Sequence, residues 1–198
     1  MSMGSLQYEN NLISQGKLRL AGMDEVGRGS LAGPVTVACV RLPLDDLIEG
    51  IDDSKKLTAS KREKLFDIIM SKVIDYQVVH IDNRVIDRIN ILNATKLAMR
   101  QCVNQMNDID SVLVDAIQLS DTIYPTYPII GGDALSYLIG AASIVAKVIR
   151  DRIMVQYDEQ YPQYGLASNK GYGTKQHMDA IRRLGASPIH RTTFITRL

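Results

Sequence analysis

The stretch Gly22–Pro34, GMDEVGRGSLAGP, places two adjacent acids directly before a Gly-Arg-Gly tripeptide and a closing Gly-Pro turn. Residues 18–23 and 34–42 on either side are rich in apolar and β-branched side chains, so the pattern predicts two strands joined by this glycine-rich segment. Acids beside glycine and arginine indicate a site for metal and phosphate. A polar turn between two strands would explain the same residues.

The rest of the chain predicts strands alternating with helices. Short apolar or β-branched runs predict strands at 76–81, 111–115 and 127–130. Caps and helical spacing predict helices at 61–71, 82–108 (one or two), 133–157 and 175–184. Because strands come early and then alternate with helices, we expect an α/β fold in which helices flank a mixed β-sheet. No repeat or clear linker interrupts the 198 residues, which predicts a single domain over 1–198.

The composition is ordinary for a soluble globular protein, with 45% hydrophobic residues and a net charge of +1. Any contact with nucleic acid must therefore come from local clusters of Lys and Arg. Cys39 and Cys102 belong to no metal or redox motif, so we interpret them as buried thiols in a reducing, cytoplasmic compartment. The N-terminus has no signal-peptide pattern, and the apolar stretch 134–146 is too short for a bilayer, so we expect no membrane partner.

Four acids follow the predicted strands, and each has a simple alternative explanation. Asp24 and Glu25 end the first strand, Asp115 ends the strand 111–115, and Asp133 comes just after the next strand. Functional groups of open α/β sheets gather at the carboxyl ends of strands, so three separate regions could meet there. Taken singly, these acids could be a solvated turn, a strand exit and, for Asp133, a helix N-cap.

One geometric condition applies to the adjacent acids. Neighbouring strand residues point to opposite faces, so Asp24 and Glu25 can share a site only if the backbone bends between them. Gly27 and Gly29 make such a bend possible. Clustered carboxylates repel one another unless they share a cation.

A site made only of carboxylate oxygens favours Mg²⁺ or Mn²⁺ over zinc, which takes His or Cys ligands. Ions of this kind also bind phosphates, and a pair of them can promote in-line displacement at phosphorus. The three histidines, His80, His177 and His190, belong to no metal motif.

Other side chains could contact a phosphate backbone. They are Lys55 and Lys56 in DSKKLT, Ser143, Lys147 and Arg150 at helical spacing i, i+4, i+7, and Tyr172 in NKGYGTKQH. A solvated helix face and a tight Gly-Tyr-Gly turn are the alternative explanations.

The motifs, taken in order, resemble those of bacterial ribonuclease HII. They are GMDEVGRGSLAGPV, DSKKLT, INILNAT, VLVDA, GGDALSYLIGAASIVAKVIRD, KGYGTKQH and SPIHRTTF, running from about Leu20 to Phe194. Each motif alone is weak, but the ordered set is highly specific. The resemblance implies a ribonuclease-H-like mixed β-sheet flanked by helices, with the part from about residue 159 completing the substrate groove.

The resemblance also assigns expected roles to individual residues. The family's metal set falls on Asp24, Glu25, Asp115 and Asp133, with two Mg²⁺ or Mn²⁺ ions expected. The expected substrate contacts are Gly27, Arg28 and Gly29 at the ribose 2′-OH, Tyr172 at the RNA–DNA junction, and Lys55, Lys56, Ser143 and Lys147 along the nucleic-acid backbone.

The implied activity is hydrolysis of the phosphodiester on the 5′ side of ribonucleotides, in RNA/DNA hybrids or singly embedded in duplex DNA. Two-metal-ion catalysis would leave a 3′-OH and a 5′-phosphate, as needed in DNA replication and ribonucleotide excision repair. We expect a monomer. The sequence departs from the family pattern at Ala116, where glycine is usual, at Asn169, where histidine is frequent, and in the closing HRTTF.

Several alternatives stay open on the sequence. One is a hybrid-binding module without catalysis, although the four intact acids argue against it. Ribonuclease HIII carries an additional N-terminal domain, for which the roughly 20 residues before LAGMDE leave no room. A DNA-directed resolvase would differ in substrate. A nucleotide-binding scaffold lacks support because no GxxxxGK[ST] motif is present.

Overall fold

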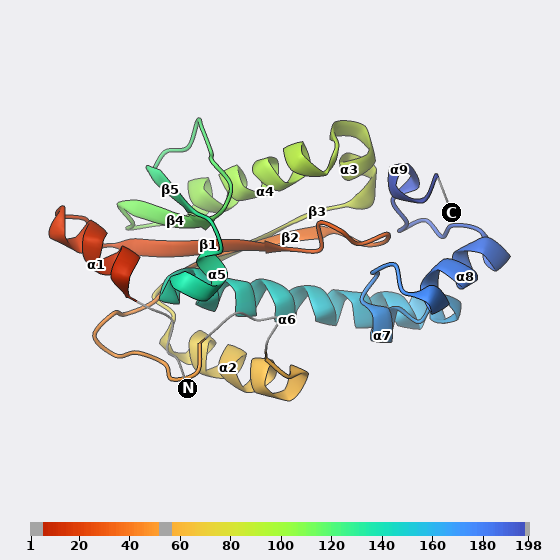
Figure 1. Cartoon of the computed structure of the whole chain (residues 1–198), viewed down its shortest axis with the longest axis horizontal. Helices are drawn as coiled ribbons and strands as arrows, with labels where there is room; N and C mark the ends of the chain where they lie inside the picture. The colour runs from red at the N-terminus through yellow and green to blue at the C-terminus, as the bar shows by residue number, and fades with distance from the viewer. Residues whose placement is uncertain (1–5, 52–56, 197–198) are drawn as a thin grey trace.

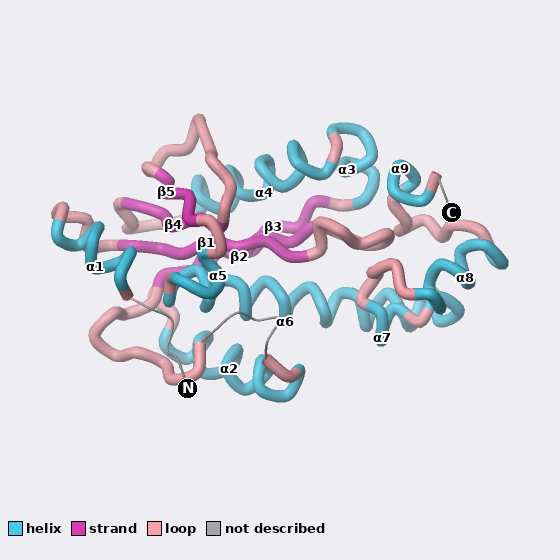
Figure 2. The backbone as a smooth tube through the Cα atoms, viewed as in Figure 1, coloured by secondary structure: helices cyan, strands magenta, loops and turns pink. Residues whose placement is uncertain are grey.

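A computed structural model describes residues 6–51 and 57–196 of the chain. Five strands form one sheet in the order β3-β2-β1-β4-β5 (Figures 1 and 2). The strands are β1 (Leu20–Val26), β2 (Val35–Arg41), β3 (Asp75–Ile81), β4 (Ser111–Asp115) and β5 (Thr126–Ile129). β2 is antiparallel to both β1 and β3, whereas β4 is parallel to both β1 and β5. The predicted mixed sheet of an α/β fold is confirmed.

Helices cover both faces of the sheet (Figure 1). One face carries α2 (Ala59–Lys72) and α6 (Tyr137–Gln160), and the other carries α3 (Asn83–Ile89) and α4 (Ile91–Gln105). The first helix, α1 (Gln7–Ser14), lies at the end of the molecule opposite the C-terminal elements. The C-terminal elements are η1 (Pro162–Tyr164), α7 (Leu166–Asn169), α8 (Lys175–Leu184) and α9 (Thr192–Ile195).

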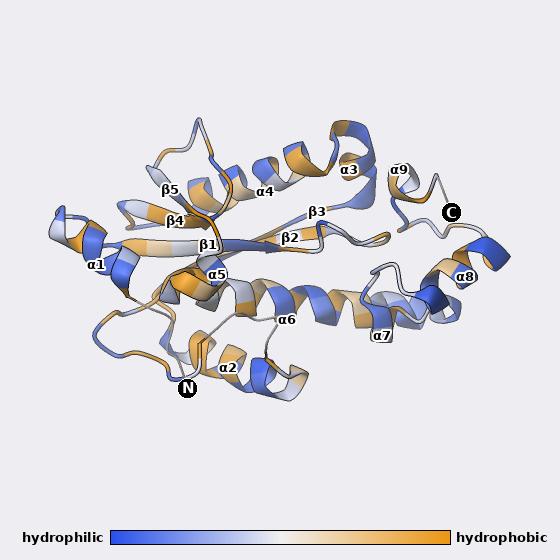
Figure 3. Ribbon diagram, viewed as in Figure 1, coloured by the Kyte–Doolittle hydropathy of each residue, from blue (hydrophilic) through white to orange (hydrophobic). Residues whose placement is uncertain are grey.

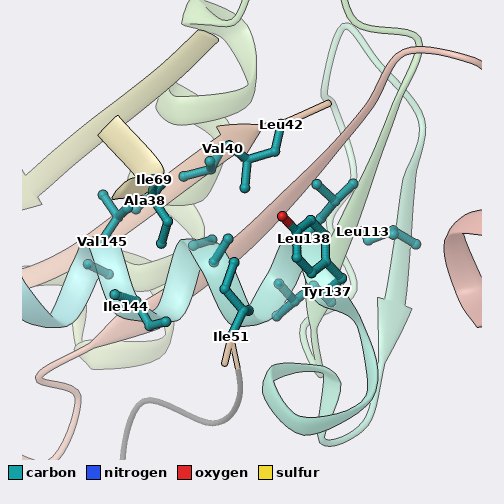
Figure 4. Close-up of a cluster of buried hydrophobic side chains, with 14 of the residues drawn as sticks. Ala38, Val40, Leu42, Ile51, Ile69, Leu113, Tyr137, Leu138, Ile144 and Val145 are labelled. Atoms are coloured by element: carbon teal, nitrogen blue, oxygen red, sulfur yellow. The ribbon is translucent and has the colours of Figure 1, made fainter. Parts of the chain in front are cut away.

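The main core lies between the sheet and α6. Ala38 and Val40 of β2 face Leu138, Ile144 and Val145 of α6 in this cluster (Figure 4). The helix approaches β1 so closely that a Cβ on Gly22 would lie 2.1 Å from the carbonyl carbon of Leu138. A second apolar cluster fills the space between the sheet and α4. Within this apolar sheet, β1 becomes hydrophilic toward its carboxyl end (Figure 3), which locates the polar site.

The predicted helix over 133–157 is interrupted in the structure. A short helix, α5 (Gly132–Leu135), comes first, and its N-cap is Gly131 with a φ of +70°. Ser136 is extended, and its hydroxyl accepts a hydrogen bond from the Ile139 amide to cap α6. The predicted start of one continuous helix at Asp133 is therefore wrong, and the alternative explanation of Asp133 as its N-cap is excluded.

The other helices agree with the prediction in part. The stretch predicted as one or two helices over 82–108 contains two, separated at Asn90, whose φ is +63°. Leu92 of this stretch is 45% exposed, although an apolar residue at helical spacing predicts an inward position. The short helices α1, α7 and α9 were not predicted. No helix in the described ranges is both long and apolar enough to cross a membrane.

Candidate active site

Parallel pairing brings two of the candidate acids to the same edge of the sheet. Met23 of β1 pairs with Val114 of β4, and continuing this register by one residue places Asp24 across from Asp115. Residues that are opposite in a parallel pair point to the same face. Asp24 is only 4% exposed, although it lies at the carboxyl end of a strand. The sheet therefore presents two neighbouring carboxylates toward α6.

The predicted bend between Asp24 and Glu25 is absent. β1 stays paired with β2 through Val26 and Thr36, and the chain turns only at Gly27, where φ is +89°. Both acids nevertheless line one hollow of about 480 Å³ at the end of β1, together with Val26, Arg62, Ser143, Lys147 and Tyr172. Asp24 and Glu25 therefore line one hollow without the bend that the sequence predicted.

The electrostatics of Asp24 are unfavourable for a carboxylate. Burial raises the pKa of Asp24 well above its ordinary value, and repulsion from Glu25 and Asp115 raises it further. A hydrogen bond with the Ser143 hydroxyl and one from the Glu25 amide, at 2.7 Å, act in the opposite direction. Three carboxylates therefore interact closely enough to disfavour their common ionisation.

Protein groups engage the other two acids. Arg28 Nη1 lies 3.2 Å from Glu25 Oε1, and the Gly132 amide donates to Asp115 Oδ1 at 2.7 Å. Asp133 follows Gly132 directly and is 9% exposed, so its backbone lies on the turn that contacts Asp115. The structure thus couples Asp24, Glu25 and Asp115 and places Asp133 on the adjoining turn.

A divalent cation suits this chemistry. The acids offer only carboxylate oxygens, which Mg²⁺ and Mn²⁺ accept, and a cation would offset the repulsion at the buried Asp24. As the described side chains stand, no three or more His, Cys, Asp or Glu groups converge so as to hold a metal ion. The residues fit an oxygen-ligated ion by chemistry and charge, with Glu25 and Asp115 at present bonded to protein groups.

A second hollow of about 560 Å³ adjoins the first and is lined by the glycine-rich loop. Its lining comprises residues 25–29 together with Ile91, Tyr172 and Phe194. The two glycines of this loop differ. A Cβ on Gly27 would lie 2.2 Å from Arg150 Nε, whereas a Cβ on Gly29 would have no atom within 4 Å. Packing therefore requires glycine at 27, while at 29 glycine leaves the backbone open to an approaching molecule.

Two buried arginines bind backbone carbonyls of the glycine-rich loop, residues 27–34, from the interior of the protein. Arg191 donates to the carbonyls of Gly33 and Arg28, and Arg150 donates to the carbonyls of Ala32 and Pro34. Arg150 also binds the Ser30 hydroxyl and the Lys170 carbonyl. Burial lowers the pKa of Arg191 to about 9, with repulsion from Arg150 adding to the effect. The loop carbonyls are therefore drawn inward, toward two cations.

This arrangement corrects the predicted stripe on α6. Arg150 is fully buried and contacts the loop, so it is no part of a solvated or substrate-facing surface. Ser143 is 3% exposed and bonds Asp24. Lys147 reaches the first hollow and pairs with Asp151 at 2.7 Å. Lys55 and Lys56 lie outside the described residues.

Tyr172 lines both hollows and is half-buried between glycines. The guanidinium carbon of Arg150 and the ammonium of Lys147 lie 5.5 and 5.8 Å from its ring centroid. Gly171 has a φ of +82°, and a Cβ there would lie 2.5 Å from the Ala32 carbonyl oxygen. The glycine before Tyr172 therefore permits close contact between this turn and the 27–34 loop.

The positions that depart from the ribonuclease HII pattern are structurally accommodated. Ala116 has a φ of +51°, a conformation that glycine adopts more easily. The Asn169 side chain bridges its own turn by donating to the Tyr164 carbonyl and accepting from the Gly171 amide. Thr192 and Thr193 both donate to the Asp87 carboxylate.

Sequence reasoning missed several residues of the site. Arg62 lines the first hollow, and Ile91 and Phe194 line the second. Arg62 lies in the first turn of α2, soon after the cationic DSKK segment of the sequence, and that charge was a usable signal. Ile91 and Phe194 gave no signal, because an apolar residue near a helix start is most often a core residue.

The chain resembles known proteins over nearly its whole length. Residues 21–197 match the family model described as Ribonuclease HII. Ribonuclease HII of Ruminiclostridium cellulolyticum is 52% identical over 96% of this chain and 75% of that protein. The protein of the same name from Caldanaerobacter subterraneus is 49% identical over 96% and 80%.

Solved structures with the same fold extend this comparison. Ribonuclease H2 of Pyrococcus horikoshii superposes with a TM-score of 0.73 at 26% identity, covering 89% of this chain and 93% of that one. In a PCNA:RNase HII complex from Archaeoglobus fulgidus, the matched chain gives a TM-score of 0.78 at 24% identity, over 91% and 97%. The ribonuclease-H-like fold is thereby confirmed.

Proposed function

The chain belongs to the ribonuclease HII family, and from this premise we propose that it cuts the phosphodiester on the 5′ side of ribonucleotides, including single ones embedded in duplex DNA. Family membership makes it a nuclease of the ribonuclease H type, which acts on RNA/DNA hybrids and needs a divalent metal. The position of the cut, the single-ribonucleotide substrate and the use of two ions are the parts that we propose.

One observation carries the proposal. The buried Asp24, disfavoured as a carboxylate by Glu25 and Asp115, opens into a hollow that continues to the Gly27–Gly29 backbone and Tyr172. This arrangement supports a cation site at Asp24 beside a backbone surface that a sugar can approach. This combination suits cleavage of a phosphodiester whose neighbouring ribose contacts the Gly27–Gly29 backbone and Tyr172.

We assign Asp24, Glu25, Asp115 and Asp133 as the groups that hold metal. When bound, a pair of Mg²⁺ or Mn²⁺ ions supplies charge compensation and polarises the phosphodiester. A ribonuclease HIII structure was solved in complex with Mn²⁺, which supports Mn²⁺ as a test ion here. Glu25 would hold the ion in place of its present partner Arg28, and the Arg28 guanidinium would then be available to a phosphate.

The loop residues are assigned to recognition of the sugar. With the carbonyls of Arg28 and Gly33 bonded inward to Arg191, the open backbone at Gly29 faces the hollow. The Tyr172 hydroxyl can donate to a ribose 2′-OH, and its ring can pack against a sugar or base. Lys55, Lys56 and Lys147 are proposed to contact phosphates. Ser143 acts on Asp24 in this assignment, although the sequence indicated the nucleic-acid backbone.

We further propose one catalytic unit over 1–198, in which the part from about residue 159 completes the groove. The positions of Tyr172 and Phe194 in the hollows support this. We place the enzyme in the cytoplasm, where bacterial duplex DNA lies, and expect a monomer. Light scattering should give about 22.0 kDa for the purified chain.

The proposal is tested with a labelled DNA duplex that contains one ribonucleotide. We expect a single cut on its 5′ side with Mg²⁺ or Mn²⁺, a 5′-phosphate on the downstream product, and no cut with chelator. An all-DNA duplex and an all-DNA four-way junction are the controls. Cleavage of either control, or cleavage confined to continuous hybrids, would contradict the proposed substrate.

A further inference from the structure

Two buried histidines form a hydrogen-bonded chain behind Tyr172. His177 of α8 and His190 are 0% and 1% exposed, and their Nε2 atoms lie 3.0 Å apart. His177 Nδ1 lies 2.9 Å from the Tyr172 carbonyl oxygen. At the other end, His190 Nδ1 lies 3.0 Å from the Ser187 amide nitrogen and 2.8 Å from its hydroxyl.

The hydrogen-bond partners at the two ends of the chain determine which ring nitrogen carries each proton. The Ser187 amide can only donate, so His190 Nδ1 must accept and a neutral His190 carries its proton on Nε2. That proton is donated to His177 Nε2, which leaves the His177 proton on Nδ1. His177 Nδ1–H then donates to the Tyr172 carbonyl, which can only accept. The two rings are therefore a one-way chain of neutral imidazoles with different tautomers.

An additional proton is disfavoured in this chain, because the Ser187 hydroxyl is the one group beside the described rings that could accept from it. On His190 Nδ1 it would face the Ser187 N–H, and on His177 Nε2 it would face the His190 N–H. The surroundings also oppose a cation: burial and the neighbouring ring lower the pKa of His190 to about 4, and burial lowers that of His177.

The Tyr164 ring packs beside the pair, 4.8 Å from the His190 ring centroid. Among the described residues, neither histidine ring has a carboxylate partner within hydrogen-bonding distance.

The same segment is bonded to the glycine-rich loop. His190 forms an isolated β-bridge with Ala32, and the Arg191 amide donates to the Leu31 carbonyl. The histidine chain thus connects the backbone of Tyr172 to the segment that supports residues 27–34. These are the two parts of the second hollow that are proposed to meet the ribose.

We propose that His177 and His190 are positioning residues: as a neutral relay they hold the Tyr172 backbone in register with the 27–34 loop, so that both meet the same ribonucleotide. The inference rests on the proposed role of Tyr172 and deepens it. Neither ring touches substrate in this scheme, so the relay acts through the position of Tyr172 alone.

A matched pair of substitutions at one position tests the functional part. In His177→Asn the amide nitrogen replaces Nδ1 and keeps the donor to Tyr172, whereas His177→Gln reaches the Nε2 position and loses that donor. We expect His177→Gln to lower kcat/KM on a single-ribonucleotide duplex by roughly fivefold, the value of one hydrogen bond. His177→Asn should stay within about twofold of the wild type. His80→Gln, which alters a histidine on β3 outside the relay, is the control.

Equal losses in the two His177 variants, or equal losses on the single-ribonucleotide duplex and on a continuous hybrid, would overturn the positioning role. Circular dichroism melting of each variant shows whether it folds.

A second measurement needs no variant and no activity. Nitrogen-15 NMR of the wild-type imidazoles at pH 7 should show His177 protonated on Nδ1 and His190 protonated on Nε2. The opposite tautomer in either ring, or a charged ring, would overturn the relay. If the wild type cut no ribonucleotide duplex, the proposed function would fail, while these tautomers would still decide whether the relay exists.

Discussion

The acids of the site and the loop that faces them are held in place by different means. The acidic wall, formed by Asp24, Glu25 and Asp115, lies on paired strands whose backbone hydrogen bonds fix each side chain. The loop wall, formed by residues 27–34 and 171–173, lies outside the five strands. Its carbonyls converge instead on the buried guanidiniums of Arg150 and Arg191.

The difference shows how a loop can be kept rigid without a sheet. A guanidinium offers five N–H groups in a fixed plane, so one side chain can orient several carbonyls at once. Removing such a side chain leaves those buried carbonyls without a donor, which costs more than the hydrogen bonds themselves contributed. We therefore expect polar substitutions in the acidic wall to leave the fold intact. Removal of Arg150 or Arg191 should instead unfold the loop wall.

The largest expected effect is loss of turnover in the acidic wall. Asp24→Asn removes a buried charge that Glu25 and Asp115 repel, so the variant should melt at a higher temperature than the wild type. Cleavage should fall by roughly 10³-fold or more, because several kcal/mol of metal-dependent stabilisation is lost. Melting curves and cleavage rates measured on the same preparation check both. An active variant would show that Asp24 holds no metal. A variant with a lower melting temperature would show that the Asp24 carboxylate stabilises the fold.

Glycine substitutions probe the loop wall next. Gly27→Ala forces a Cβ to within 2.2 Å of Arg150 Nε at a φ of +89°, so the free energy of unfolding should fall by about 2–5 kcal/mol. Gly29→Ala meets no atom within 4 Å and should change stability by less than about 1 kcal/mol. Urea denaturation of both variants tests this.

The same two glycines separate folding from recognition. Gly29→Ala should weaken binding of a single-ribonucleotide duplex while it stays folded, because its methyl group lies on the open face of the loop. If this variant binds normally, the backbone at residue 29 does not approach the sugar.

Acid should destabilise the loop wall through His190. Its pKa is about 4 in the fold, against about 6.5 in an unfolded chain, so the unfolded state binds more protons between these values. This contribution to stability is complete above pH 6.5 and is lost as the pH falls toward 4. Between pH 7 and 5 it should amount to about 2 kcal/mol. The free energy of unfolding of the wild type should fall by that much more than that of His190→Asn, and parallel pH profiles would contradict it.

The smallest expected effect concerns Lys147. Neutralising one phosphate contributes about −0.9 to the slope of log K against log salt, so Lys147→Ala should flatten the slope by about one. Asp151 already pairs with Lys147, so the change in affinity should be small. Arg19→Ala, at the opposite end of β1, is the matched control and should leave the slope unchanged. A slope that Lys147→Ala does not alter would make this residue a solvated ion pair.

Sequence patterns predicted the acidic wall well and the loop wall poorly, for a physical reason. Strand and helix periodicity follows burial of apolar side chains, and the acids stand at the ends of such patterns. Arg150 fits the polar face of a helix by spacing, yet it is buried because carbonyls of a distant loop surround it. Periodicity reports the polarity of a side chain, not which backbone groups reach it.

The break before α6 illustrates the same limit. GGDALSYL reads as one continuous helix, and Asp133 is an ordinary capping residue. In the structure the buried Glu9 of α1 accepts from the Ser136 hydroxyl and from the Leu138 amide, at 2.6 and 3.1 Å. A contact between residues more than 120 positions apart thus accompanies the helix start, and local sequence carries no sign of it.

The bonds between Arg191 and the Gly33 carbonyl span 158 positions of the chain. The ribosome synthesises the chain from its N-terminus. Asp24, Glu25 and the 27–34 loop therefore emerge long before Arg150 and Arg191, which bind the loop carbonyls. Until residue 191 has been added and has cleared the exit tunnel, the loop carbonyls lack the guanidinium that orients them. A nascent chain therefore cannot present a finished substrate surface before residue 191 has emerged, and competence to cut nucleic acid arises only after that point.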